Sequence, residues 1–499
     1  MRSRVDVEQA LAAPLHIPDE PVPGVNLEGF LESESGLGEI ARGLGAAVER
    51  AGIPLSAISY RRTPSRQKHP LAFPLAAGAP YDTNVICLNA DHLAQFAADV
   101  GIRLFANRYS IGVWFWETNV FRSEDRAAAR FLDEIWVASD YVRRAVEPEV
   151  EITVNVVPVV VRAPSGPFAT RAELWLPRGY TFLFLYDFVS AERKNPKGVV
   201  EAFTRAFAPG EGPKLVLKSM NGQERKPRQL AELVELARAR DDILVRDGYV
   251  SAAERDSYLA ACDCYVSLHR SEGFGLTLAE AMACGKPAIA TGYSGNLEFM
   301  DESNSYLVPY RLVEIPDEWW AYTPDAVWAE PDVERAAELM RRVYEDPVAA
   351  HTRGERGRQD LVGRFSLERA SAAVSELVER SRARRTSGPD PREKITEASL
   401  LLAQPIGAAI PGSPGGRPLG AVWRLLRRAL WPLLAEQRSI QSALVDALVV
   451  CREAVAALEA RTSELERRSH PGGYLATEID PDASLAREEL ISAEPVALE

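Results

Sequence analysis

Two glutamates with seven residues between them stand in a glycine-rich stretch of the chain, SEGFGLTLAEAMACG. Glu272 lies beside Gly273 and Gly275, which permit backbone conformations closed to other residues and let a ligand approach the main chain. The segment after them predicts a helix that begins near Leu276, whose free N–H groups and partial positive charge favour a diphosphate. Glu280 lies one turn further along the same side, where its carboxylate could bind both hydroxyls of a ribose. A sugar, a diphosphate and a ribose in this order make up a nucleotide-sugar.

The alternative interpretation is a glycine turn flanked by two solvated glutamates, because two glutamates at a given spacing are common by chance. The elements around the pair argue for function. Residues 263–269 (DCYVSLH) predict a buried strand, residues 287–291 (PAIAT) predict the next one, and Gly285 is expected to end the helix between them. A strand–helix–strand unit places the glycine turn at the carboxyl edge of a parallel sheet, where ligands bind in open α/β folds.

Strands and helices alternate along most of the chain in two successive series. The first begins at Gly24 with GVNLEGFL, and the second begins at Tyr180 with YTFLFLYDFV. The Pro- and Gly-rich residues 160–179 are interpreted as the connection between them. Ser251 and Glu254 are expected to form a capping box at the start of one helix. The alternation predicts an α/β protein with two Rossmann-like domains, each a parallel sheet covered by helices on both faces.

Composition excludes several other classes of function. The net charge of −13 argues against a nucleic-acid partner. Five cysteines in 499 residues indicate buried free thiols in a reducing compartment, and Cys262-x-Cys264 has the wrong spacing for a zinc site. Neither a signal peptide nor an apolar run of about 20 residues is present. We expect a cytoplasmic protein without metal or resident cofactor, at most peripheral on the inner face of a membrane.

The stretch SEGFGLTLAEAMACGKPAIAT resembles the retaining glycosyltransferases of family 4, also called glycosyl transferases group 1, which have the two-domain GT-B fold with a cleft between the domains. The residues that carry the resemblance are Glu272, Gly273, Phe274, Gly275, Leu276, Glu280, Ala281, Gly285 and Pro287. It extends over residues 24–382. It implies a metal-independent hexosyltransferase that uses a nucleotide-sugar such as a UDP- or GDP-sugar. The implied acceptor is a glycan or glycolipid in cell-surface polysaccharide synthesis.

The resemblance also implies roles for residues of the second domain. Glu272 would contact the hydroxyls of the donor sugar, the backbone around Phe274, Gly275 and Leu276 would hold donor oxygens, and Glu280 would bind the ribose. Family members use an Arg and a Lys in the loop after the first strand of this domain to clamp the diphosphate.

Here that loop is SAERKNPKG, which offers Arg193 and Lys194, whereas Phe188 stands about where the family has a Gly-Arg pair. The cations would stabilise the charge that develops on the leaving diphosphate. The alternative for this loop is a solvated basic turn before a helix that Asn195 and Pro196 are expected to cap.

The first domain offers further candidates. SESGLGEIAR resembles the family's glycine loop, in which Gly36 and Gly38 would let the backbone approach donor phosphates or acceptor; an ordinary strand–helix turn is the alternative. In GVWFWETNVF, the alternation predicts Trp116 and Glu117 at the carboxyl edge of a strand, facing the cleft.

The tryptophan would suit a sugar ring on the acceptor side and the carboxylate a substrate hydroxyl, unless these are core aromatics with one edge glutamate. Asn89 and His92 end a neighbouring strand and could also line the acceptor side, although His92 equally suits a helix start.

The predicted organisation has seven parts. They are a flexible leader (1–23), an N-terminal acceptor domain (24–165), a C-terminal nucleotide-sugar domain (166–362), a crossover helix back to the first domain (363–384), a linker (385–418), an amphipathic or coiled helix (419–469) and a disordered tail (470–499). The basic, tryptophan-containing helix is typical of a segment that lies on an anionic membrane, and its apolar spacing equally favours self-association through residues 419–467.

No second carboxylate is obviously placed as a covalent nucleophile, so we expect the acceptor to attack on the face from which the nucleotide leaves. Two rival functions remain at this stage. A nucleotide-sugar epimerase of the same fold would isomerise the donor. A non-enzymatic sugar-binding scaffold would bind it unchanged and recruit partners through the C-terminal helix.

Overall fold

The computed structural model describes residues 11, 15–63, 65–316, 322 and 325–385, which all belong to one compact unit within Met1–Ser439. Residues 386–499 lie outside the described residues. They contain almost all of the predicted linker, the whole of the predicted C-terminal helix and the predicted tail.

The first sheet has six parallel strands in the order β2-β1-β3-β4-β5-β6. Their bounds are β1 (Val22–Gly29), β2 (Leu55–Ser59), β3 (Tyr81–Cys87), β4 (Tyr109–Trp114), β5 (Glu134–Val137) and β6 (Thr153–Val156). Successive residues point to opposite faces, so Val85 and Ile86 of β3 belong to different hydrophobic clusters. One face packs against α1 (Gly36–Arg50), and the other packs against α2 (Ala90–Val100), η3 (Ser123–Phe131) and α3 (Asp140–Val146).

The second sheet also has six parallel strands, in the order β12-β11-β10-β7-β8-β9. Their bounds are β7 (Thr181–Asp187), β8 (Lys214–Met220), β9 (Ile243–Asp247), β10 (Cys264–Ser267), β11 (Ala288–Thr291) and β12 (Tyr306–Val308). The chain builds β7 to β9 in one direction and β10 to β12 in the other. The order therefore reverses between β7 and β10, and the loops that leave these two strands diverge at the carboxyl edge.

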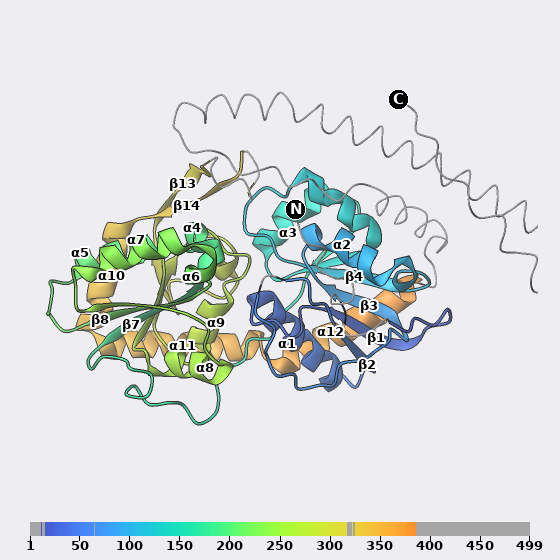
Figure 1. Ribbon diagram of the computed structural model, residues 1–499, viewed down its shortest axis with the longest axis horizontal. Helices are drawn as coiled ribbons and strands as arrows, with labels where there is room; N and C mark the ends of the chain where they lie inside the picture. The colour runs from blue at the N-terminus through green and yellow to red at the C-terminus, as the bar shows by residue number, and fades with distance from the viewer. Residues whose placement is uncertain (1–10, 12–14, 64, 317–321, 323–324, 386–499) are drawn as a thin grey trace, which may run out of the picture. The chain divides into compact units, whose positions relative to one another are not determined.

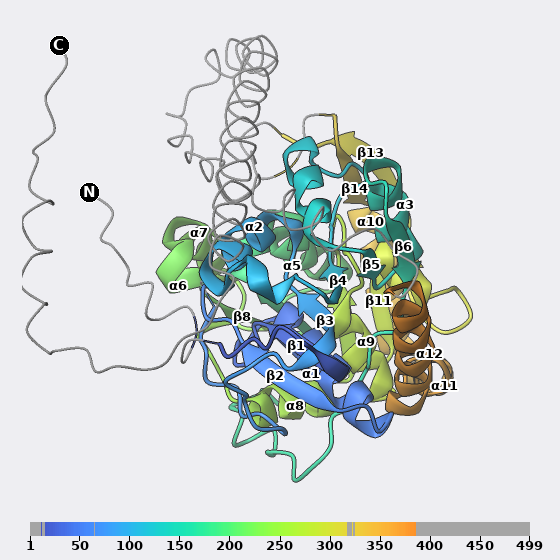
Figure 2. The same ribbon diagram turned by 90° about the vertical axis from the view of Figure 1, so that its right-hand side faces the viewer.

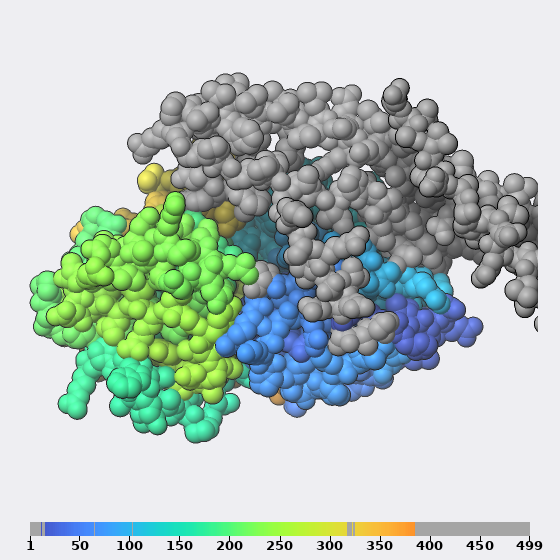
Figure 3. Space-filling view, in the orientation of Figure 1, coloured from blue at the N-terminus to red at the C-terminus, as the bar shows by residue number. Residues whose placement is uncertain are grey.

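Helices cover both faces of the second sheet (Figure 1). One face carries α5 (Pro196–Ala206), α7 (Pro227–Arg238) and α10 (Val333–Glu345). The other carries α8 (Ala252–Ala261), α9 (Leu276–Ala283) and α11 (Pro347–Arg364). The short α4 (Ala191–Lys194) and α6 (Gly222–Arg225) follow the exits of β7 and β8, and in the space-filling view the atoms of α7 lie on the surface (Figure 3).

The predicted α/β alternation is confirmed, as are several predicted helix ends. The side chain of Asn195 accepts a hydrogen bond from Gly198 N at 3.1 Å, and Ser251 and Glu254 form the expected capping box. α9 ends at Ala283 with Cys284 as its C-cap, followed by Gly285 with a φ of 71°. Among the cysteines, Cys87, Cys262 and Cys264 are buried free thiols, as expected, while Cys284 is partly exposed.

Two local predictions are corrected. β4 stops at Trp114 and does not continue to Trp116, because Asn89 Oδ1 accepts the hydrogen bond of Phe115 N at 2.8 Å and takes it from the sheet ladder. The antiparallel pair β13 (Tyr310–Glu314) and β14 (Val327–Pro331) was not predicted.

The last described helix, α12 (Leu367–Arg385), follows α11 and packs against α1 of the first domain (Figure 2). Ion pairs fasten it there. Arg384 and Arg380 lie 3.3 Å and 3.7 Å from the carboxylate of Glu134, which is 0% exposed, and Arg382 lies 3.4 Å from Asp82. This helix falls in the segment predicted to cross back to the first domain.

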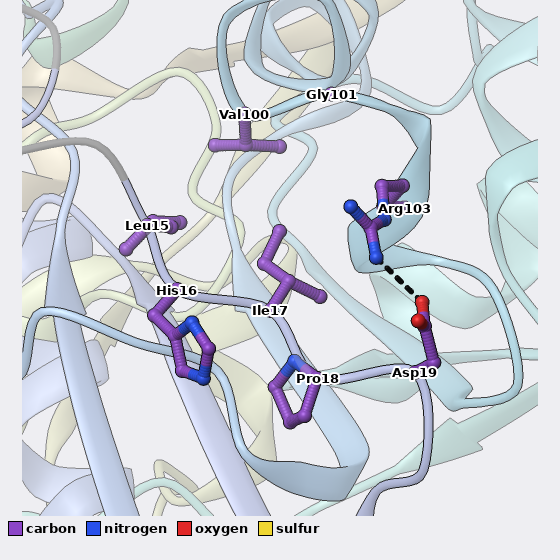
Figure 4. A pocket seen from close by; sticks show the side chains of 8 residues that line it. All are labelled: Leu15, His16, Ile17, Pro18, Asp19, Val100, Gly101 and Arg103. Carbon is purple, nitrogen blue, oxygen red and sulfur yellow. Dashed lines mark hydrogen bonds and ion pairs between the residues drawn. The ribbon is translucent and has the colours of Figure 1, made fainter. Parts of the chain in front are cut away.

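The N-terminal segment contacts the first domain before β1 begins. His16 forms a bridge with Gly78, and the backbone oxygen of Pro18 accepts from Arg108 at 2.8 Å. A cavity of about 430 Å³ lies between this segment and the end of α2, next to the ion pair of Arg103 with Asp19 (Figure 4). Because α2 starts at the carboxyl end of β3 and runs back, this cavity lies at the opposite edge of the sheet from the loops discussed below.

Candidate active site

The loops that leave β7 and β10 bring Arg193, Lys194 and Glu272 together at the point where the strand order reverses. Arg193 Nη1 donates to Glu272 Oε2 at 3.1 Å and to the backbone oxygen of Ser271 at 2.7 Å. Lys194 Nζ forms an ion pair with the other carboxylate oxygen of Glu272. Arg193 and Glu272 are buried. Side chains that lie 78 and 79 positions apart in the sequence thus form one ionic cluster.

The charges in this cluster hold one another in the ionised state. Burial would raise the pKa of Glu272, but Lys194 and Arg193 outweigh it and lower the pKa to about 2. Burial lowers the pKa of Arg193, while the carboxylates of Glu117 and Glu272 raise it by more. Arg193 and Glu272 therefore stay charged throughout the neutral pH range.

Glu117 brings a carboxylate of the first domain to the same guanidinium group. It follows the end of β4, and its Oε1 lies 3.6 Å from Arg193 Nη2. Burial raises the pKa of Glu117, and Arg193 counteracts this only in part. Arg193 thus lies between one acid of each domain.

The start of α9 is formed by backbone alone. Gly275 is the N-cap with a φ of 91°, and no side chain caps the helix. The ring of Phe274 packs against Phe299 and Phe365, with centroid distances of 5.0 Å and 5.5 Å. Only the main chain of Phe274 is therefore available to a ligand, and the first turn from Leu276 presents N–H groups next to the ionic cluster.

Gly273 lies where the two domains meet. Its backbone has no positive φ, but a Cβ added there would lie 3.1 Å from the backbone oxygen of Trp116. Its own carbonyl oxygen would lie 2.1 Å from a Cβ added at Gly295. A side chain at either position would therefore push the glycine loop, residues 271–275, away from its neighbours.

Glu280 is 3% exposed, and only one of its two carboxylate oxygens has a partner among the described residues. Its Oε1 lies 3.2 Å from Arg255 of α8, and its Oε2 has no hydrogen-bond partner among the described residues. Burial raises its pKa to about 7, with smaller contributions from Glu39 and Asp256, while Arg255 lowers it. A buried acceptor without a partner is costly, so this oxygen is suited to a ligand hydroxyl. Arg255 was not predicted.

The two glycines in the first turn of α1, Gly36 and Gly38, differ in how closely their surroundings pack against them. Ser35 caps this helix and accepts from Gly38 N at 3.2 Å. A Cβ on Gly38 would lie 2.5 Å from the backbone oxygen of Ser33, whereas a Cβ on Gly36 would meet nothing within 4 Å. Local packing therefore explains why position 38 is Gly38. No contact within the described chain requires a glycine at Gly36.

The predicted acceptor-side residues are used mainly to build the turn after β4. Trp116 Nε1 donates to Val120 O at 2.7 Å, and its ring packs against Phe121 at 5.1 Å. Asn89 holds Phe115 N as described above. The ring of His92 meets Phe30 edge-on at 5.5 Å, and its side chain is 41% exposed. Among the contacts of the described residues, none joins these three side chains to Glu272.

Residues 177–360 match the family model described as Glycosyl transferases group 1. This region is a glycosyl transferases group 1 domain. It contains the second sheet, Arg193, Lys194, Arg255 and the stretch from Glu272 to Glu280.

Two curated proteins are similar to part of the chain. D-inositol 3-phosphate glycosyltransferase of Arthrobacter sp. (strain FB24) is 26% identical over 240 residues, which cover 45% of this chain and 51% of that protein. The GtfA subunit of the UDP-N-acetylglucosamine–peptide N-acetylglucosaminyltransferase of Streptococcus gordonii is 25% identical over 266 residues, covering 52% and 48%. The chain thus spans about half the length of the curated relatives it matches.

Solved structures share the fold of both domains. Anabaena HepE in complex with UDP and glucose has a TM-score of 0.52 at 13% identity, and the match covers 72% of this chain and 100% of that chain. Sucrose-phosphate synthase from Thermosynechococcus elongatus has a TM-score of 0.53 at 19% identity, with the same coverage. The two Rossmann-like domains therefore have the GT-B arrangement seen in glycosyltransferase structures.

Neither a metal-binding cluster nor a membrane-spanning helix is present among the described residues. No group of three or more His, Cys, Asp or Glu side chains could hold a metal ion there. In the same part of the chain, no helix is long and apolar enough to cross a membrane.

Proposed function

We propose that this protein is a retaining, metal-independent glycosyltransferase of family 4 that moves a hexose from a nucleotide-sugar to a glycan or lipid-linked acceptor. The observation that carries the proposal is the pair of unlike carboxylates on either side of the α9 N-terminus. Glu272 is ionised and held by two cations, and one oxygen of Glu280 has no partner within the residues that the structure describes. The family match of residues 177–360 and the glycosyltransferase relatives support it.

A UDP- or GDP-sugar would bind with its ribose at Glu280, its diphosphate at the first turn of α9 and its sugar at Glu272. The cations of Arg193 and Lys194 neutralise Glu272 in the absence of donor. When donor phosphate oxygens arrive, the same cations would face a second set of negative charges. Glu272 would then accept hydrogen bonds from sugar hydroxyls in place of part of its ion pairing.

In the transfer step, the bond from the anomeric carbon to the β-phosphate oxygen breaks and a bond to the acceptor oxygen forms. The proton of the acceptor hydroxyl passes to the leaving phosphate oxygen. Arg193 and Lys194 stabilise the negative charge that develops there, and the domains hold both substrates in place. Attack on the face from which the nucleotide leaves retains the anomeric configuration.

Glu117 provides the sharpest test of this stereochemical route. It is a carboxylate of the first domain within 3.6 Å of Arg193, and a nucleophile would have to come from such a position. A glycosyl group trapped on Glu117, detected by mass spectrometry of the peptide after rapid quenching, would replace the front-face route with a double displacement.

The proposed activity is tested with a panel of UDP- and GDP-hexoses, with and without glycan and lipid-linked acceptors. Nucleotide release is followed by a coupled assay and the sugar product by NMR. Transfer or slow hydrolysis with retention is expected. Isomerised donor would identify an epimerase, and binding without conversion would identify a sugar-binding scaffold. Glu272→Gln is the matched inactive control.

We also propose that the protein works in the cytoplasm, with residues 419–467 taking it to the inner face of a membrane or to a second copy in cell-surface polysaccharide synthesis. Co-sedimentation of the full chain and of residues 1–384 with anionic liposomes tests this. Equal pelleting of the two proteins would reject the membrane.

A further inference from the structure

The start of α3 in the first domain is hydrogen-bonded to the glycine loop of the second domain. Ser139 is the N-cap of α3 and accepts from Val142 N at 3.2 Å. Its hydroxyl donates at the same time to the backbone oxygen of Gly273, 2.6 Å away. Ser139 is 0% exposed, so this is a buried and specific contact. The residue that caps a helix in one domain thus also forms a hydrogen bond to the loop of the other domain.

A second hydroxyl on the same helix extends this contact. The Tyr141 hydroxyl lies 3.2 Å from Ser271 Oγ and 3.3 Å from the Tyr293 hydroxyl. Ser271 Oγ in turn donates to the backbone oxygen of Glu117. Burial raises the pKa of Tyr141, so its hydroxyl keeps its proton. Residues before and after Glu272 are therefore both held by α3.

The bond from Ser139 sets the orientation of a peptide group in the loop. In a trans peptide, the carbonyl oxygen and the N–H of the next residue point in opposite directions. With Gly273 O turned toward α3, the N–H of Phe274 must point away from it. Phe274 is the residue whose ring is buried, so its main chain is what the loop offers a ligand.

We propose that Ser139 and Tyr141 are positioning residues of the transferase: the first domain orients the glycine loop of the second, so the sugar end of the donor site is correctly formed only when the two domains are engaged. This inference rests on the proposed function. The inference predicts that the ribose end and the sugar end of the donor site respond differently to changes in α3. Glu280 and Arg255 both belong to the second domain and pair without α3, whereas Ser271 and Gly273 on either side of Glu272 are in contact with its start.

The inference predicts that loss of these contacts lowers turnover but leaves nucleotide affinity nearly unchanged. Loss of one buried hydrogen bond should misalign the donor sugar, while the ribose end keeps its contacts. For Ser139→Ala and for Tyr141→Phe we expect kcat to fall about 3- to 10-fold, and the Kd of UDP or GDP to change less than twofold.

The experiment compares Ser139→Ala, Ser139→Thr, Tyr141→Phe and Ser366→Ala. Ser366 Oγ accepts from Arg369 N at 3.3 Å at the start of α12, so its variant loses a comparable cap without touching the loop. Ser139→Thr keeps a hydroxyl and should recover most of kcat, and Ser366→Ala should keep wild-type kcat. Wild-type kcat in Ser139→Ala and Tyr141→Phe, or equal losses in Ser366→Ala, would overturn the inference.

Hydrogen exchange of residues 271–275 provides a readout that does not need turnover. Amide exchange in this loop should speed up in Ser139→Ala and Tyr141→Phe and stay unchanged in Ser366→Ala. Unchanged exchange in both loop variants overturns the inference. If wild type converts no donor but the loop exchange responds as stated, the proposed activity fails while the contribution of α3 to the loop stands.

Discussion

Arg255 and Glu280 form an incomplete pair: the guanidinium group lies 3.2 Å from one carboxylate oxygen, and the other oxygen has no hydrogen-bond partner in the described part of the chain. This arrangement keeps a carboxyl group buried and close to its titration point, with a pKa of about 7. Hydroxyl groups of a ribose would donate to the ionised form and favour it. If a donor ribose binds there as proposed, its binding and the protonation of Glu280 would therefore be linked.

The first prediction concerns pH. Because Glu280 must ionise to accept two hydroxyls, donor binding should weaken as the pH falls from 8 to 6, by up to about tenfold per pH unit below 7. Binding at pH 6.5 should release protons. Calorimetry with a UDP- or GDP-hexose in two buffers of different ionisation enthalpy measures this release, and Glu280→Gln should abolish it. Proton uptake by the wild type would contradict the assignment.

The second prediction concerns Glu272. In Glu272→Gln the shape is kept, but Arg193 and Lys194 lose their counter-charge. Transfer should fall about 100-fold, because the hydroxyl contact and the charge balance at the sugar are lost. UDP or GDP should bind as tightly as in wild type or more tightly, because the freed cations can face its phosphates. Parallel loss of nucleotide binding and turnover would mean that Glu272 only supports the fold.

Glu28 gives a third prediction, which concerns stability alone. It lies in β1, is 0% exposed, and neither carboxyl oxygen has a hydrogen-bond partner among the described residues. Burial raises its pKa well above 4.5. The folded state therefore keeps a proton that the unfolded state loses above about pH 4.5, so stability declines as the pH rises toward the folded pKa.

Glu28→Gln removes this dependence. The melting temperature of the variant minus that of the wild type should increase between pH 5 and pH 8. A difference that is constant over this range would show that Glu28 does not carry its proton in the folded state.

A fourth prediction contrasts two glycines. A Cβ at Gly295 would lie 2.1 Å from the backbone oxygen of Gly273, whereas a Cβ at Gly363, inside α11, would meet nothing within 4 Å. Gly295→Ala should displace the glycine loop and lower both the melting temperature and the turnover. Gly363→Ala should stabilise the fold by about 0.5–1 kcal/mol, because alanine loses less backbone freedom on folding. Thermal melts and turnover of both variants check this, and tolerance of Gly295→Ala would show that the loop can move without cost.

Much of the second domain could be predicted from the sequence because its signals are local. The glycines, the capping residues and the alternation around Glu272 and Glu280 each specify structure within a few positions. Arg193 and Lys194 could be placed near the site because they lie in the segment after β7, where the strand order reverses. These assignments need only the rule that parallel strands meet at one edge.

The contacts that could not be predicted all depend on residues that lie far apart in the sequence. Arg255 sits on an ordinary helix, and its pairing with Glu280 depends on how two helices pack. Ser139 and Tyr141 look like a common helix start until the second domain is placed against them. The predicted continuation of β4 to Trp116 was wrong because a side chain from another strand, Asn89, competes for one backbone N–H.

The docking of α12 on α1 decides which domain carries the rest of the chain. Because the polypeptide returns to the first domain before Arg385, everything that follows is covalently attached there and not to the domain with Glu280. If residues 419–467 bind a membrane or a second copy, the chain would reach that surface from the first domain. A lipid-linked acceptor would then be presented at high local concentration, while the second domain could exchange spent nucleotide for fresh donor between successive transfers.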